Sequence, residues 1–153
     1  MPQNIYNMNF GEIAAVAGKG GLFKVLKPSK AGVILESLDG KKTKLVVGAD
    51  ARVSILSEIS IYTHTQEGST PLIDVMRKIH EEFDGDTGLT KNSDAEELKS
   101  FLKHILPDYD EDRVYVSDIK KLITWYNLLA EIDPDSFMKD EEAPEASEEK
   151  EAE

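Results

Sequence analysis

A glycine-rich segment, Gly18-Lys19-Gly20-Gly21, is the first part of the sequence that could do chemistry, because glycine loops can cradle phosphates. A P-loop ends in Lys-Ser/Thr, and here a glycine follows the lysine. Phosphate loops also run from a strand into a helix, whereas this segment is expected to lead from a helix into a strand. We interpret it as a turn and predict no cofactor.

Three aspartates at alternate positions between two predicted helices resemble the start of an EF-hand loop: Asp108, Asp110 and Asp112. Such a loop needs glycine at its sixth position and a bidentate glutamate at its twelfth. Arg113 and Ile119 stand at these positions. Asp84-Gly85-Asp86 fails in the same way, so we predict acidic connections rather than calcium sites.

Other catalytic and metal-binding patterns are missing from the sequence. The three histidines, His64, His80 and His104, lack the i, i+4 spacing of a helical metal site, and His80 and His104 are expected on the surface. No serine lies in a G-x-S-x-G or S-x-x-K motif, and there is no cysteine. We therefore predict no catalytic residues, no metal and no enzymatic activity.

Lysines are concentrated in the N-terminal part of the chain. Residues 1–66 carry eight basic and five acidic groups, which makes this part the only one with a positive net charge. Within it Lys41, Lys42 and Lys44 form a candidate anion or nucleic-acid surface. Aromatic side chains for base stacking are few, and the remainder of the chain would repel a polyanion. Nucleic-acid binding is therefore the alternative and not the leading hypothesis.

The segment that ends at Ile132 is the more informative one. Its apolar residues form two stripes at helical spacing, and the second contains Trp125, Leu128 and Ile132. An ordinary surface helix needs an apolar arc of only about 100°. The second stripe must therefore be covered, either by the chain itself or by another chain. We predict a protein interface at these three residues, and a homodimer is one form that it could take.

The elements expected to position these residues fall into two groups. Residues 9–17 are predicted to form a short helix, because Asn9 and Glu12 have the spacing of a capping box. Strands are predicted at residues 22–27, 32–38, 41–47 and 58–63, and residues 52–56 are either a fifth strand or a helical turn. Asp39-Gly40 favours a hairpin. This order is typical of a small antiparallel β-barrel of SH3-like or Sm-like type.

Helical periodicity replaces the strand pattern after residue 66. Three helices are predicted, over residues 71–83, 94–106 and 118–132. The domains are then a small β-barrel at 9–66, a helical domain at 67–132 and a disordered acidic tail at 133–153. The tail has ten acidic groups against two basic ones and no apolar periodicity. The fold class is α+β.

Length and composition limit the class of protein. The 153 residues carry 18 basic and 30 acidic side chains, a net charge of −12. No apolar run approaches the roughly 20 residues that span a bilayer. The N-terminus lacks the basic flank and apolar core of a signal peptide. We therefore expect a cytoplasmic protein with no membrane association.

Several segments resemble those of a bacterial family of conserved proteins of unknown function: IAAVAGKGGLFKVL, GVILESLDGKK, EISIYT and LPDYDEDRVYVSDIKKLITWYNLL. The resemblance implies a small N-terminal β-barrel domain followed by a helical domain, and it implies no activity. From all of these observations the sequence predicts a non-enzymatic interaction or adaptor protein with a protein partner. A small barrel that binds nucleic acid is the alternative.

Overall fold

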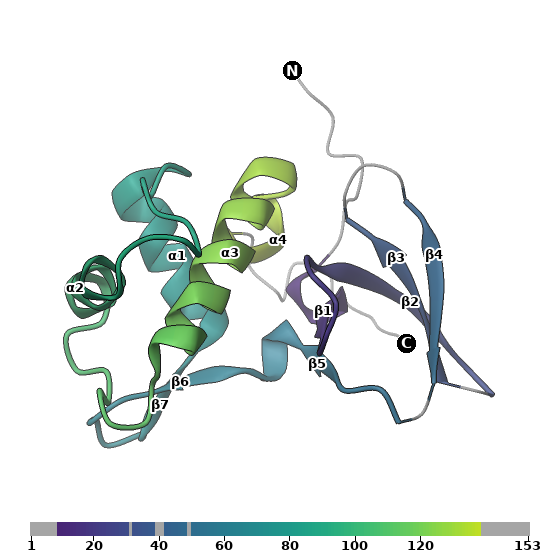
Figure 1. The fold of residues 1–153 in the computed structure, drawn as a ribbon, viewed down its shortest axis with the longest axis horizontal. Coiled ribbons are helices and arrows are strands. Elements are labelled where there is room, and N and C mark those ends of the chain that lie inside the picture. Colours follow the sequence, from purple (N-terminus) through teal and green to yellow (C-terminus); the bar gives the residue numbers. More distant parts are fainter. Residues whose placement is uncertain (1–8, 31, 39–41, 49, 139–153) are drawn as a thin grey trace, which may run out of the picture.

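The computed structural model describes residues 9–30, 32–38, 42–48 and 50–138. Five antiparallel strands form one sheet in the order β4-β3-β2-β1-β5. Their bounds are β1 (Ile13–Val16), β2 (Phe23–Ser29), β3 (Gly32–Ser37), β4 (Lys44–Gly48) and β5 (Val53–Ile55). Figure 1 shows this sheet on one side of the molecule and the helices on the other. The fold is α+β.

The helical side is connected to the sheet by a second, two-stranded sheet. It contains β6 (Ser60–Tyr62) and β7 (Ser69–Pro71), which pair antiparallel. The helices that follow are α1 (Leu72–Phe83), α2 (Ala95–Ile105), α3 (Val116–Ile132) and α4 (Asp135–Met138). No described helix has the length and apolar character that crossing a bilayer requires.

The prediction of an SH3-like or Sm-like barrel is wrong. Strands β4 and β5 occupy opposite edges of the sheet, and within the described ranges no pairing joins them, so the sheet stays open. Short strands separated by turn residues are equally compatible with an open sheet and with a barrel. The helices reach the sheet at β1, where Ile13 belongs to the main core, whereas β2, β3 and β4 contribute to a separate small cluster.

The predicted helix over residues 9–17 is also wrong. The Asn9 backbone N–H does donate to the Glu12 carboxylate at 2.9 Å, as a capping box requires, but the turn η1 (Phe10–Glu12) ends there. The next residues form β1, which pairs with β2 on one side and with β5 on the other. Central sheet pairing therefore overrides the helical preference of the alanines in this segment.

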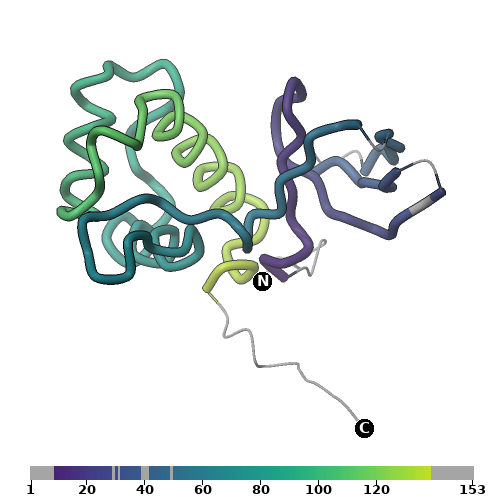
Figure 2. Tube along the Cα trace, turned by 90° about the horizontal axis from the view of Figure 1, so that it is seen from below, coloured from purple at the N-terminus to yellow at the C-terminus, as the bar shows by residue number. Residues whose placement is uncertain are grey.

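One main core joins the sheet to the helices. It contains Phe10, Ile13, Leu22, Leu38 and Leu56 from the N-terminal part, together with the buried residues of α1, α2 and α3. Figure 2 shows the two layers side by side along this junction. A smaller cluster on the sheet contains Val16, Phe23, Leu35 and Val47. The junction between the layers is thus a packed interior and not a flexible linker.

The prediction of a disordered tail is wrong for its first residues. Residues 133–138 are ordered, and α4 places Phe137 fully within the main core. The Phe137 ring lies 5.4 Å from the His80 ring and 5.8 Å from the Tyr126 ring, measured between centroids. A single aromatic residue in an acidic run has no periodicity that would have revealed this helix. Residues 139–153 lie outside the described residues.

Gly32 provides a test of the sheet. Its φ is +154°, and a Cβ atom there would lie 1.8 Å from the carbonyl oxygen of Val47 on β4. We expect Gly32→Ala to separate the ends of β3 and β4 and to destabilise the fold by about 1–3 kcal/mol in chemical denaturation. Gly20→Ala is the control, because a Cβ atom at Gly20 meets nothing within 4 Å. Equal stability of the two variants would contradict this description of the β3–β4 pairing.

Candidate functional site

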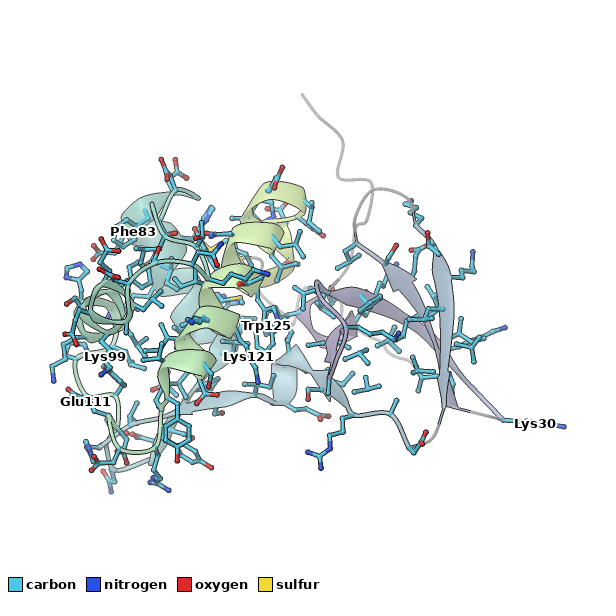
Figure 3. The ribbon with its side chains drawn as sticks, viewed as in Figure 1. Lys30, Phe83, Lys99, Glu111, Lys121 and Trp125 are labelled. Atoms are coloured by element: carbon cyan, nitrogen blue, oxygen red, sulfur yellow. The ribbon has the colours of Figure 1, made fainter. Side chains whose placement is uncertain are left out.

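A cleft of about 580 Å³ lies between the sheet and the helices, where the turn joining β1 to β2 faces the first half of α3. Residues 15–21 and Ser54 of β5 form its sheet wall. The helical side contributes Lys91, Asn92, Lys120, Lys121, Thr124 and Trp125. Figure 3 shows Lys121 and Trp125 on the side of α3 that faces the sheet. We call this the lysine cleft, after Lys19, Lys91, Lys120 and Lys121.

The glycine segment forms the sheet wall of the lysine cleft. Gly18 and Gly21 have φ values of +85° and +78°, which other residues rarely adopt, so they permit the sharp reversal between β1 and β2. The Lys19 backbone N–H donates to the Val16 carbonyl at 3.0 Å and closes this turn. The segment is a turn, as predicted, but it joins two strands and not a helix to a strand.

Helical spacing arranges the opposite wall. Lys120 and Thr124 are four residues apart, as are Lys121 and Trp125, so they form two neighbouring rows on one face of α3. Thr124 donates a hydrogen bond to the Lys120 carbonyl at 2.8 Å. Trp125 is partly buried and packs against the main core. The wall therefore combines mobile ammonium groups with one fixed aromatic ring.

The four lysines of the cleft are exposed and lack acidic partners. Within the part of the chain that the structure describes, none of them forms an ion pair with a carboxylate. The protein nevertheless has a net charge of −12, with 30 acidic side chains available. Four uncompensated lysines around one concavity therefore make a local positive potential in an acidic protein, which would attract an anionic ligand.

An apolar cavity of about 260 Å³ adjoins the lysine cleft. The two concavities share Ser54, Lys121 and Trp125. Five aliphatic residues line the apolar cavity: Ile59, Ile61, Leu72, Val114 and Leu122. The rest of its lining is aromatic, charged or hydroxyl-bearing: Ser54, Ser60, Tyr62, Arg113, Asp118, Lys121 and Trp125. We use the term composite groove for the lysine cleft and the apolar cavity together.

Only one of the residues predicted from sequence lies in this groove. Trp125 lines both concavities, whereas Leu128 and Ile132 are partly buried against the main core and line neither. All three are partly buried against the main core, and Trp125 also lines the groove. A homodimer through the stripe stays a prediction, which light scattering of the full chain tests.

The predicted basic surface lies elsewhere. Lys42 precedes β4 and Lys44 is its first residue, and neither lines either concavity. Lys41 lies outside the described residues. The lysines that do gather were not grouped in the sequence, because they come from three separate segments. The sequence feature that could have indicated this cleft is the pair Lys120-Lys121. Lys121 precedes Trp125 by four residues and therefore lies on the same face of the helix.

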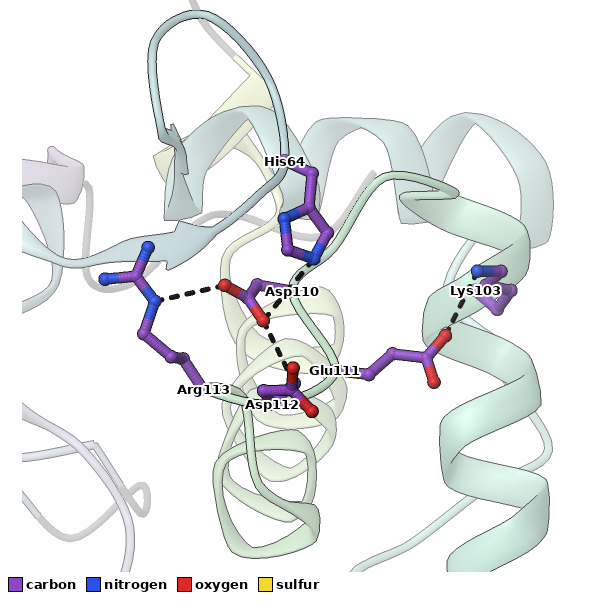
Figure 4. A network of polar contacts seen from close by, with 6 residues as sticks. All are labelled: His64, Lys103, Asp110, Glu111, Asp112 and Arg113. Carbon is purple, nitrogen blue, oxygen red and sulfur yellow. Dashed lines mark hydrogen bonds and ion pairs between the residues drawn. The ribbon is translucent and has the colours of Figure 1, made fainter.

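Among the three aspartates that resemble the start of an EF-hand loop, Asp110 has a structural role. Its buried carboxylate accepts hydrogen bonds from the Arg113 Nε and from the Asp112 backbone N–H, both at 3.0 Å, and His64 Nε2 lies 3.5 Å away (Figure 4). The Asp110 backbone N–H donates to Tyr62 of β6. Among the described residues no group of three His, Asp or Glu side chains could hold a metal. Asp110 instead connects β6 to the start of α3.

This arrangement makes a pH-dependent prediction for stability. The hydrogen bond from Arg113 is the main reason that the pKa of Asp110 lies below its usual value, and the Asp112 amide and His64 add to it. A lowered pKa in the folded state means that the ionised carboxylate stabilises the fold at neutral pH. This contribution is lost as the pH falls through the lowered pKa.

We therefore expect Asp110→Asn to be less stable than the wild type in urea at neutral pH. The difference should shrink as the solution is acidified below the usual carboxyl range. Asp112→Asn is the matched control, because Asp112 contributes its backbone N–H and its side chain is exposed. A difference that stays constant at all pH values would mean that Asp110 acts through packing and not through its charge.

The prediction that His80 lies on the surface is wrong. Its side chain is 18% exposed, and its Nδ1 lies 2.9 Å from the Tyr126 hydroxyl. The Gly85 backbone N–H also donates to that hydroxyl at 2.9 Å. Burial raises the pKa of Tyr126. His80 is thus part of the packing around α4, while His104 is exposed and lies 3.1 Å from Glu82.

Comparisons with known proteins add two family models and one solved structure. Residues 11–56 match the Domain of unknown function (DUF5606), and residues 59–129 match the Domain of unknown function (DUF6852). A solution NMR structure of a Northeast Structural Genomics Consortium target from Bacteroides vulgatus is 33% identical. The match covers 90% of this chain and 94% of that chain, with a TM-score of 0.66. No curated protein matches.

Proposed function

The chain belongs to the same family as this Bacteroides vulgatus protein, and since the matching domains are of unknown function, we propose from the groove that it is a non-enzymatic interaction protein of the cytoplasm. Its lysine cleft binds an acidic segment of a partner protein. The observation that carries this proposal is the gathering of four exposed lysines around one concavity of an acidic chain, with no ion pair to a carboxylate of the described residues.

The charges of the cleft act together on a ligand that reaches into it. A single exposed ion pair contributes only about 0.2–1 kcal/mol. Four lysines from the β1–β2 turn, the loop before α2 and α3 surround the same space, so a ligand with several carboxylates can contact more than one of them. Trp125 adds an aromatic surface, which is common at the centre of protein interfaces.

Single-stranded nucleic acid is the second candidate, because a partly buried tryptophan among lysines could also stack on a base. One feature favours a protein segment instead. Proteins that bind single strands stack successive bases on several aromatic side chains, whereas Trp125 is the one aromatic residue among those that line the lysine cleft.

Fluorescence can test the proposal, since Trp125 is the only tryptophan of the chain. We would titrate the full chain with hexaglutamate and with an oligothymidylate of similar charge at near-physiological salt. We expect hexaglutamate to change the Trp125 emission in a saturable way and the oligonucleotide to bind more weakly. Tighter binding of the oligonucleotide would favour the second candidate, and the absence of any response to hexaglutamate would refute the proposal.

A further inference from the structure

We infer that the composite groove recognises an extended peptide in which one bulky apolar residue stands next to acidic residues. The apolar residue enters the cavity below Trp125, and the acidic residues face the lysine cleft. This inference rests on the proposed function and specifies the partner. It follows from the position of two concavities with different chemistry on the same face of α3.

The two concavities are close enough for neighbouring residues of one ligand. Ser54, Lys121 and Trp125 line both of them, so the apolar cavity and the lysine cleft are adjacent. An extended peptide advances about 3.3 Å per residue. Its side chains alternate between two faces, so the acidic residues two positions before and after the apolar one, about 6.6 Å away, face the groove on the same side as the cavity. Lys121 lines both concavities and is available to these carboxylates.

The apolar cavity can accept a ligand with both kinds of group. Five aliphatic residues line it, so a bulky apolar side chain that enters it loses contact with water. Arg113 and Lys121 also line it, so carboxylates next to the apolar side chain have cationic partners, while Asp118 disfavours a carboxylate close to itself. The groove thus favours a peptide that combines an apolar residue with acidic residues over a uniformly acidic one, which would leave the aliphatic lining uncovered.

The rim of the apolar cavity is held in place before a ligand arrives. The Arg113 guanidinium lies 4.3 Å from the centre of the Tyr62 ring, and its Nε donates to the buried carboxylate of Asp110. A rim that is already ordered loses little conformational freedom on binding. This favours the insertion of a side chain into an existing cavity, without prior rearrangement of β6 or α3.

Two peptides separate this inference from the proposed function. The first has leucine between two triglutamate segments, so that either chain direction places acidic residues beside the lysines. The second has serine in place of the leucine. Isothermal titration of the full chain should give at least about tenfold tighter binding for the leucine peptide, since a buried leucine side chain adds an apolar contribution of this order.

Salt dependence distinguishes the two parts of the contact. Raising the salt concentration should weaken both peptides, because it screens the lysines, while the ratio between the two affinities should stay nearly constant. Equal affinities of the leucine and serine peptides would refute the apolar anchor and leave acidic binding standing. Binding of neither peptide would refute this inference and the proposed function together.

A variant of the protein completes the test. Ser54→Phe places a ring at the exposed position shared by both concavities and should remove the preference for leucine. Ser57→Phe is the matched control, because Ser57 is exposed on the neighbouring turn η2 (Leu56–Glu58) and lines neither concavity. Circular dichroism would establish that both variants fold. If both folded variants kept the full preference for leucine, the apolar cavity would not be the binding site.

Discussion

Replacing Lys120 and Lys121 together by glutamate is expected to weaken the binding of an acidic peptide by about 30-fold. Each exposed charge is taken to contribute on the order of 0.5 kcal/mol, and reversal removes an attraction and adds a similar repulsion. Two reversals then cost roughly 2 kcal/mol, which corresponds to the stated change in Kd. Both side chains are exposed, so the fold should tolerate the change. Isothermal titration measures the effect.

The control for this variant carries the same change in net charge at two other lysines. Lys30 and Lys99 are exposed and line neither concavity of the groove, and Figure 3 shows both of them away from Trp125. Reversal of this pair should weaken binding by less than about threefold, through the long-range field alone. Similar losses in the two double variants would mean that net charge, and not the lysine cleft, governs the affinity.

Replacing Phe137 by alanine is expected to cause the largest loss of stability, about 3–5 kcal/mol. The ring is fully buried in the main core and contacts the rings of His80 and Tyr126. For a chain of this length the loss corresponds to a melting temperature lower by roughly 6–20 °C. Differential scanning calorimetry measures this directly.

A chain that ends at Lys139 is the control for Phe137→Ala. It keeps all of α4 and removes only residues 140–153, which carry eight acidic groups and one lysine. Since these residues contain no large apolar side chain, we expect the melting temperature to change little. A drop as large as that of Phe137→Ala would show that the acidic residues themselves stabilise the fold.

The helical part of the fold could be predicted from the sequence, and the form of the sheet could not. Amphipathic spacing places α1, α2 and α3 within a few residues of their observed bounds, because burial of one face determines a helix locally. Closure of a sheet depends on which edge strands meet, and no local pattern records that β4 and β5 remain apart. The prediction for the β1 segment fails for a similar reason, since one of its two partners, β5, lies far along the sequence.

The candidate site, too, could be predicted from the sequence only in part. Trp125 could be selected from sequence, because an aromatic residue on an over-wide apolar helix face indicates an additional contact. Its grouping with Leu128 and Ile132 in one interface stays a prediction, since all three are partly buried against the main core and Trp125 also lines the groove. The convergence of Lys19 and Lys91 with Lys120 depends on tertiary structure alone, and no spacing in the sequence predicts it.

The central claim is that the composite groove is the binding site, and an NMR titration tests it most directly. Full-length chain labelled with ¹⁵N would be titrated with the peptide that has leucine between two triglutamate segments. We predict the largest shifts at the backbone amides of Gly20, Lys121 and Thr124 and at the Trp125 indole N–H, with Lys44 nearly unmoved. The largest shifts at Lys42 and Lys44, or no shifts at a saturating peptide concentration, would contradict the account.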